Sequence, residues 1–251
     1  LMARLPFRFL REIAKFTCDG PQSLYENVQK SFDWHLWLTP NLSFRVDVTG
    51  QTFGLNHSHF SALQVKNAIV DLQRETWGER SNINVKNPDI CIHLHLGNGN
   101  GVLSFDSSAN SLHKRGYRPA MGLAPLKENL AAGLIRMTGW DGMIPLVDPC
   151  CGSGTLLIEA ASIALKLSPG LNSSFLFEKW MDFDLELWNQ EREIARRVQI
   201  SDCLSSQIIG CEQNELIAQQ AKLNIKSAGL DKFIEIKTGT FNDLLLPKED
   251  G

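Results

Sequence analysis

The residues whose types and spacing best suit chemistry lie in the stretch Leu146-Val147-Asp148-Pro149-Cys150-Cys151-Gly152-Ser153-Gly154-Thr155. The apolar run from Ile144 to Val147 predicts a short buried strand, which ends in an acid, a proline and a small-residue turn. Helical spacing of apolar residues follows from Leu157 onward. A strand, a glycine loop and a helix in this order place a ligand crevice at the carboxyl end of a parallel strand. The glycines allow a close approach of the backbone, and the free N–H groups that open the helix favour a negative group.

The neighbours of this loop narrow the choice of ligand. Leu157 stands where the dinucleotide fingerprint has its third glycine, and no Gly-Lys-Ser/Thr follows, so neither a dinucleotide site nor a P-loop is favoured. Two glycines after an acid suit a nucleoside with a carboxylate tail, which describes S-adenosylmethionine (SAM). A structural turn without a ligand is the alternative.

The sequence after this loop continues the α/β pattern. Residues 207–211 predict a second strand that ends at Glu212, residues 217–228 an amphipathic helix, and residues 233–237 a third strand. The alternation predicts a parallel sheet. Glu212, at the tip of the second strand, fits an acceptor for ribose hydroxyls, although an exposed glutamate without a role is the alternative. An insertion over residues 166–206 explains its distance from Gly154.

Two residues past the third strand complete the candidate ligand site. Phe241 and Asn242 could pack on and hydrogen-bond an adenine ring, or be turn residues that touch no ligand. The residues alone leave these two interpretations open.

The first half of the chain predicts a small α+β module. Residues 42–48 and 90–96 alternate as half-buried strands, and the glycine-rich turn 97–101 leads into a third strand through Phe105. A helix begins near Ser58 and ends at Gly78. Arg4, Arg8 and Arg11 lie among apolar residues in a strand or an amphipathic element.

A basic segment, Leu112-His113-Lys114-Arg115-Gly116-Tyr117-Arg118-Pro119, follows this module. Its four cationic or protonatable side chains around one aromatic ring could hold phosphate and stack a base, and a solvated linker is the equally weighted alternative. The next helix is predicted to pack through Leu126, Leu130, Leu134 and Met137.

Composition limits the class of protein. The 251 residues are 43% hydrophobic and 21% charged, as in a globular protein, and no apolar run is long enough for a membrane span. The six cysteines form no Cys-x-x-Cys pair, which is typical of free thiols in a reducing cytoplasm. Residues 1–147 carry a net charge of +3 and the remainder −6, so the first half is the better candidate for contacting phosphates. The histidines lack partners at ligand spacing, and we expect no metal.

Two stretches together carry a family resemblance. They are residues 112–132, which include Ala124-Pro125-Leu126-Lys127-Glu128-Asn129, and residues 145–161 around Asp148-Pro149-Cys150-Cys151-Gly152-Ser153-Gly154. They closely resemble the THUMP-domain class I methyltransferases, in particular the group that methylates guanine N2 in bacterial 23S ribosomal RNA. Residues 56–71 and 87–90 are similar to the THUMP module of that group.

The resemblance implies a fold, a donor and a substrate. The expected fold is α/β, with an incomplete THUMP-type RNA-binding module over residues 1–111, a basic linker over 112–123, and a Rossmann-like doubly wound parallel sheet over 124–251. SAM would donate a methyl group to the exocyclic N2 amine of guanine in 23S ribosomal RNA, which makes structured RNA the expected partner in rRNA processing in the cytoplasm. No membrane partner is expected, and the oligomeric state is left open.

The resemblance also assigns site residues. The donor would be held by Asp148, Cys150, Gly152, Ser153, Gly154, Glu212, Phe241, Asn242 and Asp243. RNA would be contacted by Lys66, Lys114, Arg115, Tyr117 and Arg118. Thr240 stands where many relatives have the acid that reads adenine, so the adenine contact stays open between Thr240, Asn242 and Asp243.

The family's catalytic Asn-Pro-Pro-Tyr motif is absent from this sequence, so no catalytic residue is assigned. We expect an internal fragment, truncated after the third strand of the sheet, that binds SAM weakly, transfers no methyl group and self-associates through an open strand edge. Three other functions are weighed: an N6-adenine-specific DNA methylase, a non-catalytic RNA-binding fragment and, more distantly, a dehydrogenase. Methylation assays, salt-dependent RNA binding and NAD binding would separate them.

Overall fold

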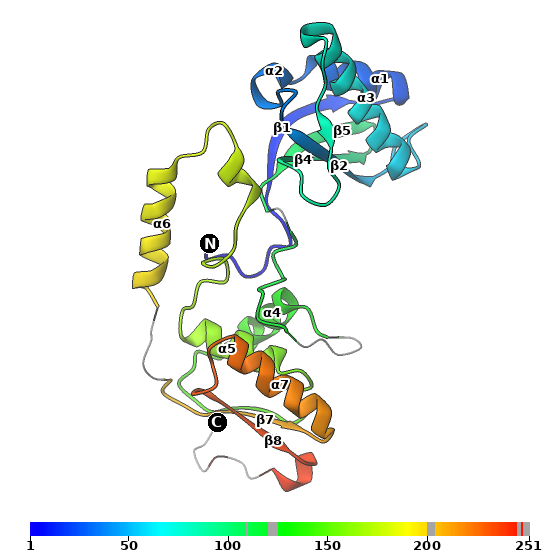
Figure 1. The fold of residues 1–251 in the computed structure, drawn as a ribbon. Coiled ribbons are helices and arrows are strands. Elements are labelled where there is room, and N and C mark those ends of the chain that lie inside the picture. The colour runs from blue at the N-terminus through cyan, green and yellow to red at the C-terminus, as the bar shows by residue number, and fades with distance from the viewer. Residues whose placement is uncertain (109, 120–124, 200–203, 245–246, 248–251) are drawn as a thin grey trace. The chain divides into compact units, whose positions relative to one another are not determined.

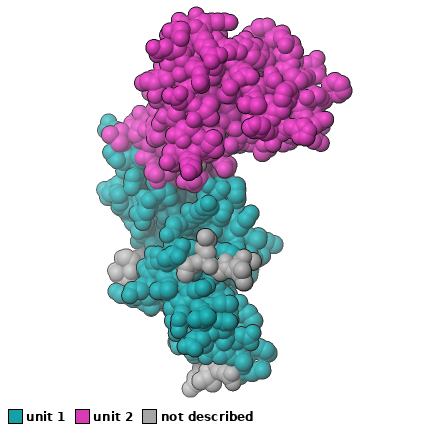
Figure 2. All heavy atoms as spheres, turned by 45° about the vertical axis from the view of Figure 1, so that its right-hand side comes forward, with its two compact units in different colours: residues 1–7, 111–173, 186–251 teal, residues 8–110, 174–185 magenta. Residues whose placement is uncertain are grey.

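The computed structural model describes residues 1–108, 110–119, 125–199, 204–244 and 247 (Figure 1). The chain divides into two compact units, coloured separately in Figure 2. Unit 1 contains residues 1–7, 111–173 and 186–251, and unit 2 contains residues 8–110 and 174–185. Each unit is therefore assembled from separate segments of the chain.

Unit 2 is built on a five-stranded mixed sheet. Its strands, in spatial order, are β1 (Leu10–Thr17), β5 (Asn100–Asp106), β4 (Ile90–Gly97), β2 (Ser43–Gly50) and β3 (Asn82–Ile83). β2 pairs in parallel with β3 and β4, whereas β5 is antiparallel to β4 and β1. The strands predicted over residues 42–48 and 90–96 and the glycine-rich hairpin are confirmed, because period-two alternation marks a sheet with one buried face.

Unit 2 contains the α-helices α1 (Pro21–Lys30), α2 (Trp34–Trp37) and α3 (Ser58–Trp77). α3 buries Val65, Ala68 and Ile69 at helical spacing, and it ends at Gly78, whose φ of 71° is left-handed. The core joins these helices to the apolar sheet residues, including Phe44, Ile92, Leu94, Leu103 and Phe105. The helix predicted from Ser58 to Gly78 is thus confirmed.

The second segment of unit 2, residues 174–185, comes from the insertion predicted over 166–206. It contains the short 3-10 helix η1 (Leu176–Lys179), and its Trp180 is 8% exposed within the core of unit 2. The Trp180 ring lies 5.6 Å from the ring of Phe105 and 6.3 Å from that of Trp37, measured between centroids. An insertion in the second half of the chain therefore completes the core of the first half.

Unit 1 is built on a parallel three-stranded sheet in the order β6 (Leu146–Asp148), β7 (Ile208–Glu212) and β8 (Ile234–Thr238). Helix α5 (Thr155–Ala164) follows β6, and α7 (Glu215–Ser227) joins β7 to β8. α4 (Glu128–Thr138) precedes β6 and packs on α5, while α6 (Leu185–Arg197) lies in the insertion. The predicted alternation of parallel strands and helices is confirmed (Figure 1).

The face through which α4 packs differs from the prediction. Leu130, Leu134 and Met137, expected to be buried, are 52%, 42% and 86% exposed. The buried apolar side chains are instead Ala131, Ala132 and Ile135. Two alanines on one face allow a closer approach between helices than leucines do, and the spacing of large apolar residues does not report this.

Candidate functional site

Two carboxylates lie at the same edge of the unit 1 sheet. Asp148 is the last residue of β6 and pairs with Gly210, two residues before Glu212 at the end of β7. Thr238, the last residue of β8, pairs with Glu212. Because the strands are parallel, all three carboxyl ends meet at one edge, which is where ligands bind in open α/β sheets.

The loop after β6 is held by its own backbone and by β7. The Cys150 N–H donates to Asp148 Oδ1 over 3.1 Å, and the Gly154 N–H donates to the Cys151 carbonyl over 2.9 Å. The Cys151 N–H donates to the carbonyl of Cys211 on β7 over 2.9 Å. These bonds fix the loop at the edge that carries Asp148 and Glu212.

The two glycines of the loop have different roles. Both have left-handed backbones, with φ of 53° at Gly152 and 81° at Gly154. A Cβ placed on Gly152 would meet no atom within 4 Å, so this part of the loop is open to a ligand. A Cβ on Gly154 would lie 3.5 Å from Ala221 of α7, so Gly154 provides the turn into α5 and does not face the open side.

Asp148 is electrostatically disfavoured as an anion. Its half-burial raises the pKa of its carboxyl above the usual 3.8, the nearby charge of Glu212 raises it further, and the Cys150 N–H opposes both effects. The Glu212 Oε1 atom accepts a hydrogen bond from the Asn214 N–H over 2.8 Å. Two carboxylates at one edge form an acceptor-rich site, which suits a ligand that brings hydroxyl or ammonium donors.

The turn after β8 lies beside the tip of β7. The Gly239 N–H donates to the Glu212 carbonyl over 3.1 Å, and the short helix η2 (Phe241–Asp243) follows. The Phe241 ring is 64% exposed and Asn242 is exposed, so both are accessible from solvent. The Asp243 side chain lies outside the described residues, and the choice between Thr240, Asn242 and Asp243 stays open.

The other two loop residues of the predicted site, Cys150 and Ser153, differ in solvent exposure. Of the five cysteines that the structure describes, Cys150 is exposed and the other four are buried. Ser153 is half-buried, and its carbonyl accepts a hydrogen bond from Asn224 Nδ2 of α7 over 3.1 Å. The structure thus brings together the loop residues and Glu212 that the sequence pointed to.

Three residues expected to contact RNA, Arg115, Tyr117 and Arg118, have buried or nearly buried side chains in unit 1. The Arg115 side chain is 6% exposed, with its Nε 3.6 Å from Glu159, and the Arg118 side chain is 10% exposed, with its Nε 3.1 Å from Glu128. Tyr117 is 9% exposed in the apolar core. Isolated buried charges are costly, and each of these guanidinium groups is paired with an interior carboxylate.

The two lysines of the same assignment are more accessible. Lys114 is exposed in unit 1, and Lys66 is half-buried on α3 of unit 2. They remain predicted phosphate contacts.

Sequence reasoning missed the buried carboxylates that receive the arginines. Glu159 is 1% exposed and is paired with Arg4 at 3.3 Å as well as with Arg115. Glu128 is 5% exposed at the start of α4. The sequence did contain one sign of these pairs, because Glu159 lies inside the apolar run 156–161 and a buried carboxylate requires a partner.

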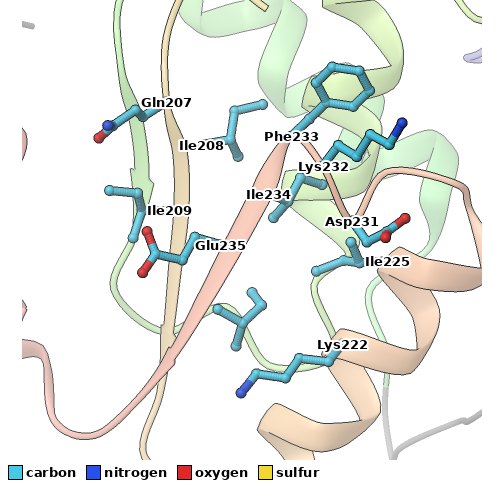
Figure 3. Close-up of a pocket in the computed structure, with 11 residues that line it drawn as sticks. Gln207, Ile208, Ile209, Lys222, Ile225, Asp231, Lys232, Phe233, Ile234 and Glu235 are labelled. Carbon is cyan, nitrogen blue, oxygen red and sulfur yellow. The ribbon is translucent and has the colours of Figure 1, made fainter.

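A cavity of about 470 Å³ lies elsewhere on the unit 1 sheet (Figure 3). It is lined by the first residues of β7 and β8, by Asp231 and Lys232 before β8, and by Lys222 and Ile225 of α7. These are the amino-terminal ends of the strands, so this cavity is separate from the edge that carries Asp148 and Glu212.

No group of three His, Cys, Asp or Glu side chains suited to a metal occurs among the residues that the structure describes. Across the same part of the chain, no helix has the length and apolar character needed to span a bilayer.

Comparison with known proteins identifies the family. The profile of the RMKL-like methyltransferase domain matches residues 115–250, and the THUMP domain profile matches residues 21–106. The chain belongs to the RMKL-like methyltransferase family. This membership confirms the resemblance and the expected order of a THUMP domain before a methyltransferase domain.

Curated and solved relatives agree with this membership. A putative RNA methyltransferase from Synechocystis sp. is 40% identical over the whole of this chain and 65% of its own length. A ribosomal RNA large subunit methyltransferase K/L from Desulfotalea psychrophila is 36% identical over the whole chain and 36% of its own length. The crystal structure of a possible methylase from Clostridium difficile is 31% identical, with a TM-score of 0.85 over 98% of this chain and 64% of that chain.

Two further crystal structures are 28% identical, each with a TM-score of 0.84. One is a predicted N6-adenine-specific DNA methylase from Listeria monocytogenes, covering 97% of this chain and 63% of that chain. The other is a putative methyltransferase complexed with S-adenosylhomocysteine (SAH), covering 99% of this chain and 66% of that chain. The chain therefore spans about two thirds or less of the length of these relatives.

Proposed function

We propose that the edge formed by β6, β7 and β8 binds SAM, and that the complete gene product methylates the N2 amine of guanine in ribosomal RNA. The observation that carries the proposal is the pair of carboxylates, Asp148 and Glu212, on neighbouring strand ends around the open backbone of Gly152. These residues fit the donor, because a ribose diol and an ammonium group are hydrogen-bond donors that need acceptors.

Each residue of the site has a defined task in this proposal. Glu212 accepts hydrogen bonds from the ribose hydroxyls, and Asp148 with the loop over residues 150–154 holds the methionine end. Exposed Phe241 packs on the adenine, with Asn242 or Asp243 as its polar contact. When bound, SAM supplies a methyl group on a positively charged sulfur. The task of these residues is to fix its orientation toward the incoming amine.

RNA is the proposed substrate because of the accompanying THUMP domain and the names of the relatives. Residues 21–106 match the THUMP domain profile, and relatives that match nearly all of this chain are named as ribosomal RNA methyltransferases. We infer that unit 2 contributes to RNA binding and that Lys66 and Lys114 contact phosphates. Guanine N2 as the acceptor atom and the 23S RNA as the target rest on the sequence resemblance.

An N6-adenine DNA methylase is the second candidate, favoured by the name of the Listeria relative. Both reactions methylate an exocyclic amine, so the same donor site serves either. The presence of the THUMP domain favours RNA.

A substrate panel tests this proposal. The complete gene product is incubated with methyl-labelled SAM and, separately, with ribosomal RNA, transfer RNA or duplex DNA. We expect label in ribosomal RNA, recovered after digestion as N2-methylguanosine. Label in N6-methyladenine of DNA would establish the second candidate, and no transfer to any of the three would overturn both.

A further inference from the structure

The basic segment 112–119 contains Arg118, whose side chain hydrogen-bonds to the first residue of helix α5, directly after the loop of the proposed donor site. Arg118 Nη2 donates to the hydroxyl of Thr155 over 2.8 Å and to the Leu126 carbonyl over 2.5 Å. Its Nε lies 3.1 Å from Glu128 Oε1, and the side chains of Arg118 and Glu128 are 10% and 7% exposed. The guanidinium is therefore fixed between the start of α4 and the start of α5.

Thr155 connects this arginine to the loop. It is the first residue of α5, directly after Gly154, and is 4% exposed. Its hydroxyl oxygen lies 3.4 Å from the hydroxyl oxygen of Ser153. The same Ser153 accepts a hydrogen bond at its carbonyl from Asn224, which is fully buried on α7. The loop is thus held from two sides, by Arg118 through Thr155 and by Asn224.

The charge of Arg118 also has an unusual location. A cation beside the amino end of a helix opposes the helix dipole, so helix stability alone does not explain its presence. Glu128 offsets part of this cost. A guanidinium beside Thr155 adds positive electrostatic potential at this turn. The proposed ligand would place its negatively charged carboxylate at the same turn.

We propose that Arg118 is a positioning residue for the donor site, which fixes the Ser153–Gly154–Thr155 turn through the Thr155 hydroxyl without touching the ligand. The inference rests on the proposed function, since it assumes that this turn holds the methionine end of SAM. It gives the basic segment a role in donor binding where the sequence predicted RNA contact.

A double-mutant cycle tests the inference, with SAH as the probe and isothermal titration calorimetry on the whole chain as the readout. We expect Arg118→Met and Thr155→Val each to weaken SAH binding about tenfold, because each removes a hydrogen bond to a charged group. The double variant should bind about as weakly as either single variant, since both disrupt one connection. Thr155→Ser, which keeps the hydroxyl, should retain affinity near that of the unsubstituted chain.

Arg4→Met is the matched control. Arg4 is also a buried arginine paired with a glutamate of α5, but its contacts are Glu159 and the carbonyls of Ser162 and Leu167, away from the loop. It should lower the melting temperature while leaving the affinity of the folded protein for SAH unchanged.

The outcomes separate the two proposals. Failure of the unsubstituted chain to bind SAH would overturn the donor site itself. Normal SAH binding with unchanged affinity in Thr155→Val, or fully additive losses in the double variant, would overturn the role of Arg118 alone. Should Arg118→Met not fold, the comparison of Thr155→Val with Thr155→Ser decides, because neither variant alters the buried ion pair.

Discussion

At the scale of single residues, Asp148 lies in the proposed donor site, but its charged carboxylate lowers the stability of the folded protein. Its pKa is raised in the folded state, chiefly by burial and then by Glu212, so the folded protein holds this proton more tightly than the unfolded chain does. Stability is therefore lost as the pH rises from 3.8 through the raised pKa, and the ionised carboxylate is destabilising at neutral pH.

Asp148→Asn should reveal this conflict between stability and binding. We expect a higher melting temperature at pH 7 in the absence of ligand, because the penalised charge is gone while an oxygen acceptor for the Cys150 N–H remains. SAH affinity should fall about tenfold with the loss of a charged acceptor. Thermal melts and calorimetry measure both, and the difference in melting temperature should shrink as the pH approaches 3.8. A lower melting temperature at pH 7 would contradict the account.

The two adjacent cysteines of the loop, Cys150 and Cys151, should react differently with an alkylating reagent. Cys150 is exposed, whereas burial raises the pKa of the Cys151 thiol to about 12, so Cys151 carries almost no thiolate at neutral pH. We expect iodoacetamide to label Cys150 and not Cys151, as shown by peptide mapping. SAH should slow this labelling in proportion to the occupied fraction of sites. A rate that saturating SAH leaves unchanged would place the ligand elsewhere.

At the scale of elements, buried ion pairs connect the N-terminal segment and the basic segment of unit 1 to helix α5. Glu159 receives Arg4 from the N-terminal segment and Arg115 from the basic segment. Glu159 is 1% exposed, so its carboxylate depends on these two arginines for its counter-charge, and they depend on it.

Glu159→Gln should destabilise unit 1 by about 3–5 kcal/mol, because it leaves two buried guanidinium groups without a counter-charge. Glu193→Gln is the control, since Glu193 is 50% exposed and pairs with Arg196 and Arg197 at the surface. It should cost less than about 1 kcal/mol. Urea unfolding gives both values, and equal losses would refute the structural role of Glu159.

The insertion segment of unit 2 makes a second element-scale prediction. Trp180 packs in the core, and Arg11 lies over the rings of both Trp37 and Trp180, at 5.0 and 5.7 Å from their centroids, while also pairing with Asp182. Trp180→Ala should therefore destabilise unit 2 by about 3–5 kcal/mol.

Its neighbour provides the control. Met181 is 62% exposed, and Met181→Ala should change stability by less than about 0.5 kcal/mol. Hydrogen exchange at β5 amides measures the effect in unit 2. Unchanged protection in Trp180→Ala would show that the segment does not belong to that core.

Much of the fold follows from local pattern, and the exceptions have physical causes. Alternation in residues 90–96 and the helical spacing that ends at Gly78 predicted β4 and α3, because each of these elements buries one face against one core. The packing of α4 and the docking of Trp180 depend on contacts distant in sequence, which periodicity does not contain. The common placement of Asp148, the glycine loop and Glu212 at one edge of the sheet could be predicted, because their positions at strand ends are local properties.

The interior partners of the arginines in the basic segment were not predicted, for a related reason. A cluster of cations in a sequence looks the same whether it faces phosphate or interior carboxylates. The partners, Glu128 and Glu159, are reached only through the fold.

At the scale of the whole molecule, the proposal joins an RNA-binding unit to a donor-binding unit. RNA binding that depends on phosphate contacts weakens as the salt concentration rises. Each lost contact makes the negative slope of log K against log salt concentration shallower by about one. We expect this change for Lys66→Ala and for Lys114→Ala. Lys232→Ala, beside the cavity at the amino ends of the strands, should leave the slope unchanged. Filter binding with a ribosomal RNA fragment at several salt concentrations measures it, and unchanged slopes for both test variants would exclude these lysines.

The most direct test of the account is the affinity of this chain for SAH, measured by calorimetry with and without the Glu212 carboxylate. The account predicts one site per chain, lost or weakened at least about tenfold in Glu212→Ala. It predicts retained binding in Glu235→Ala, whose glutamate lies on β8 beside the separate cavity. No binding by the unsubstituted chain, or equal affinity in Glu212→Ala, would contradict the donor site at the edge of β6, β7 and β8.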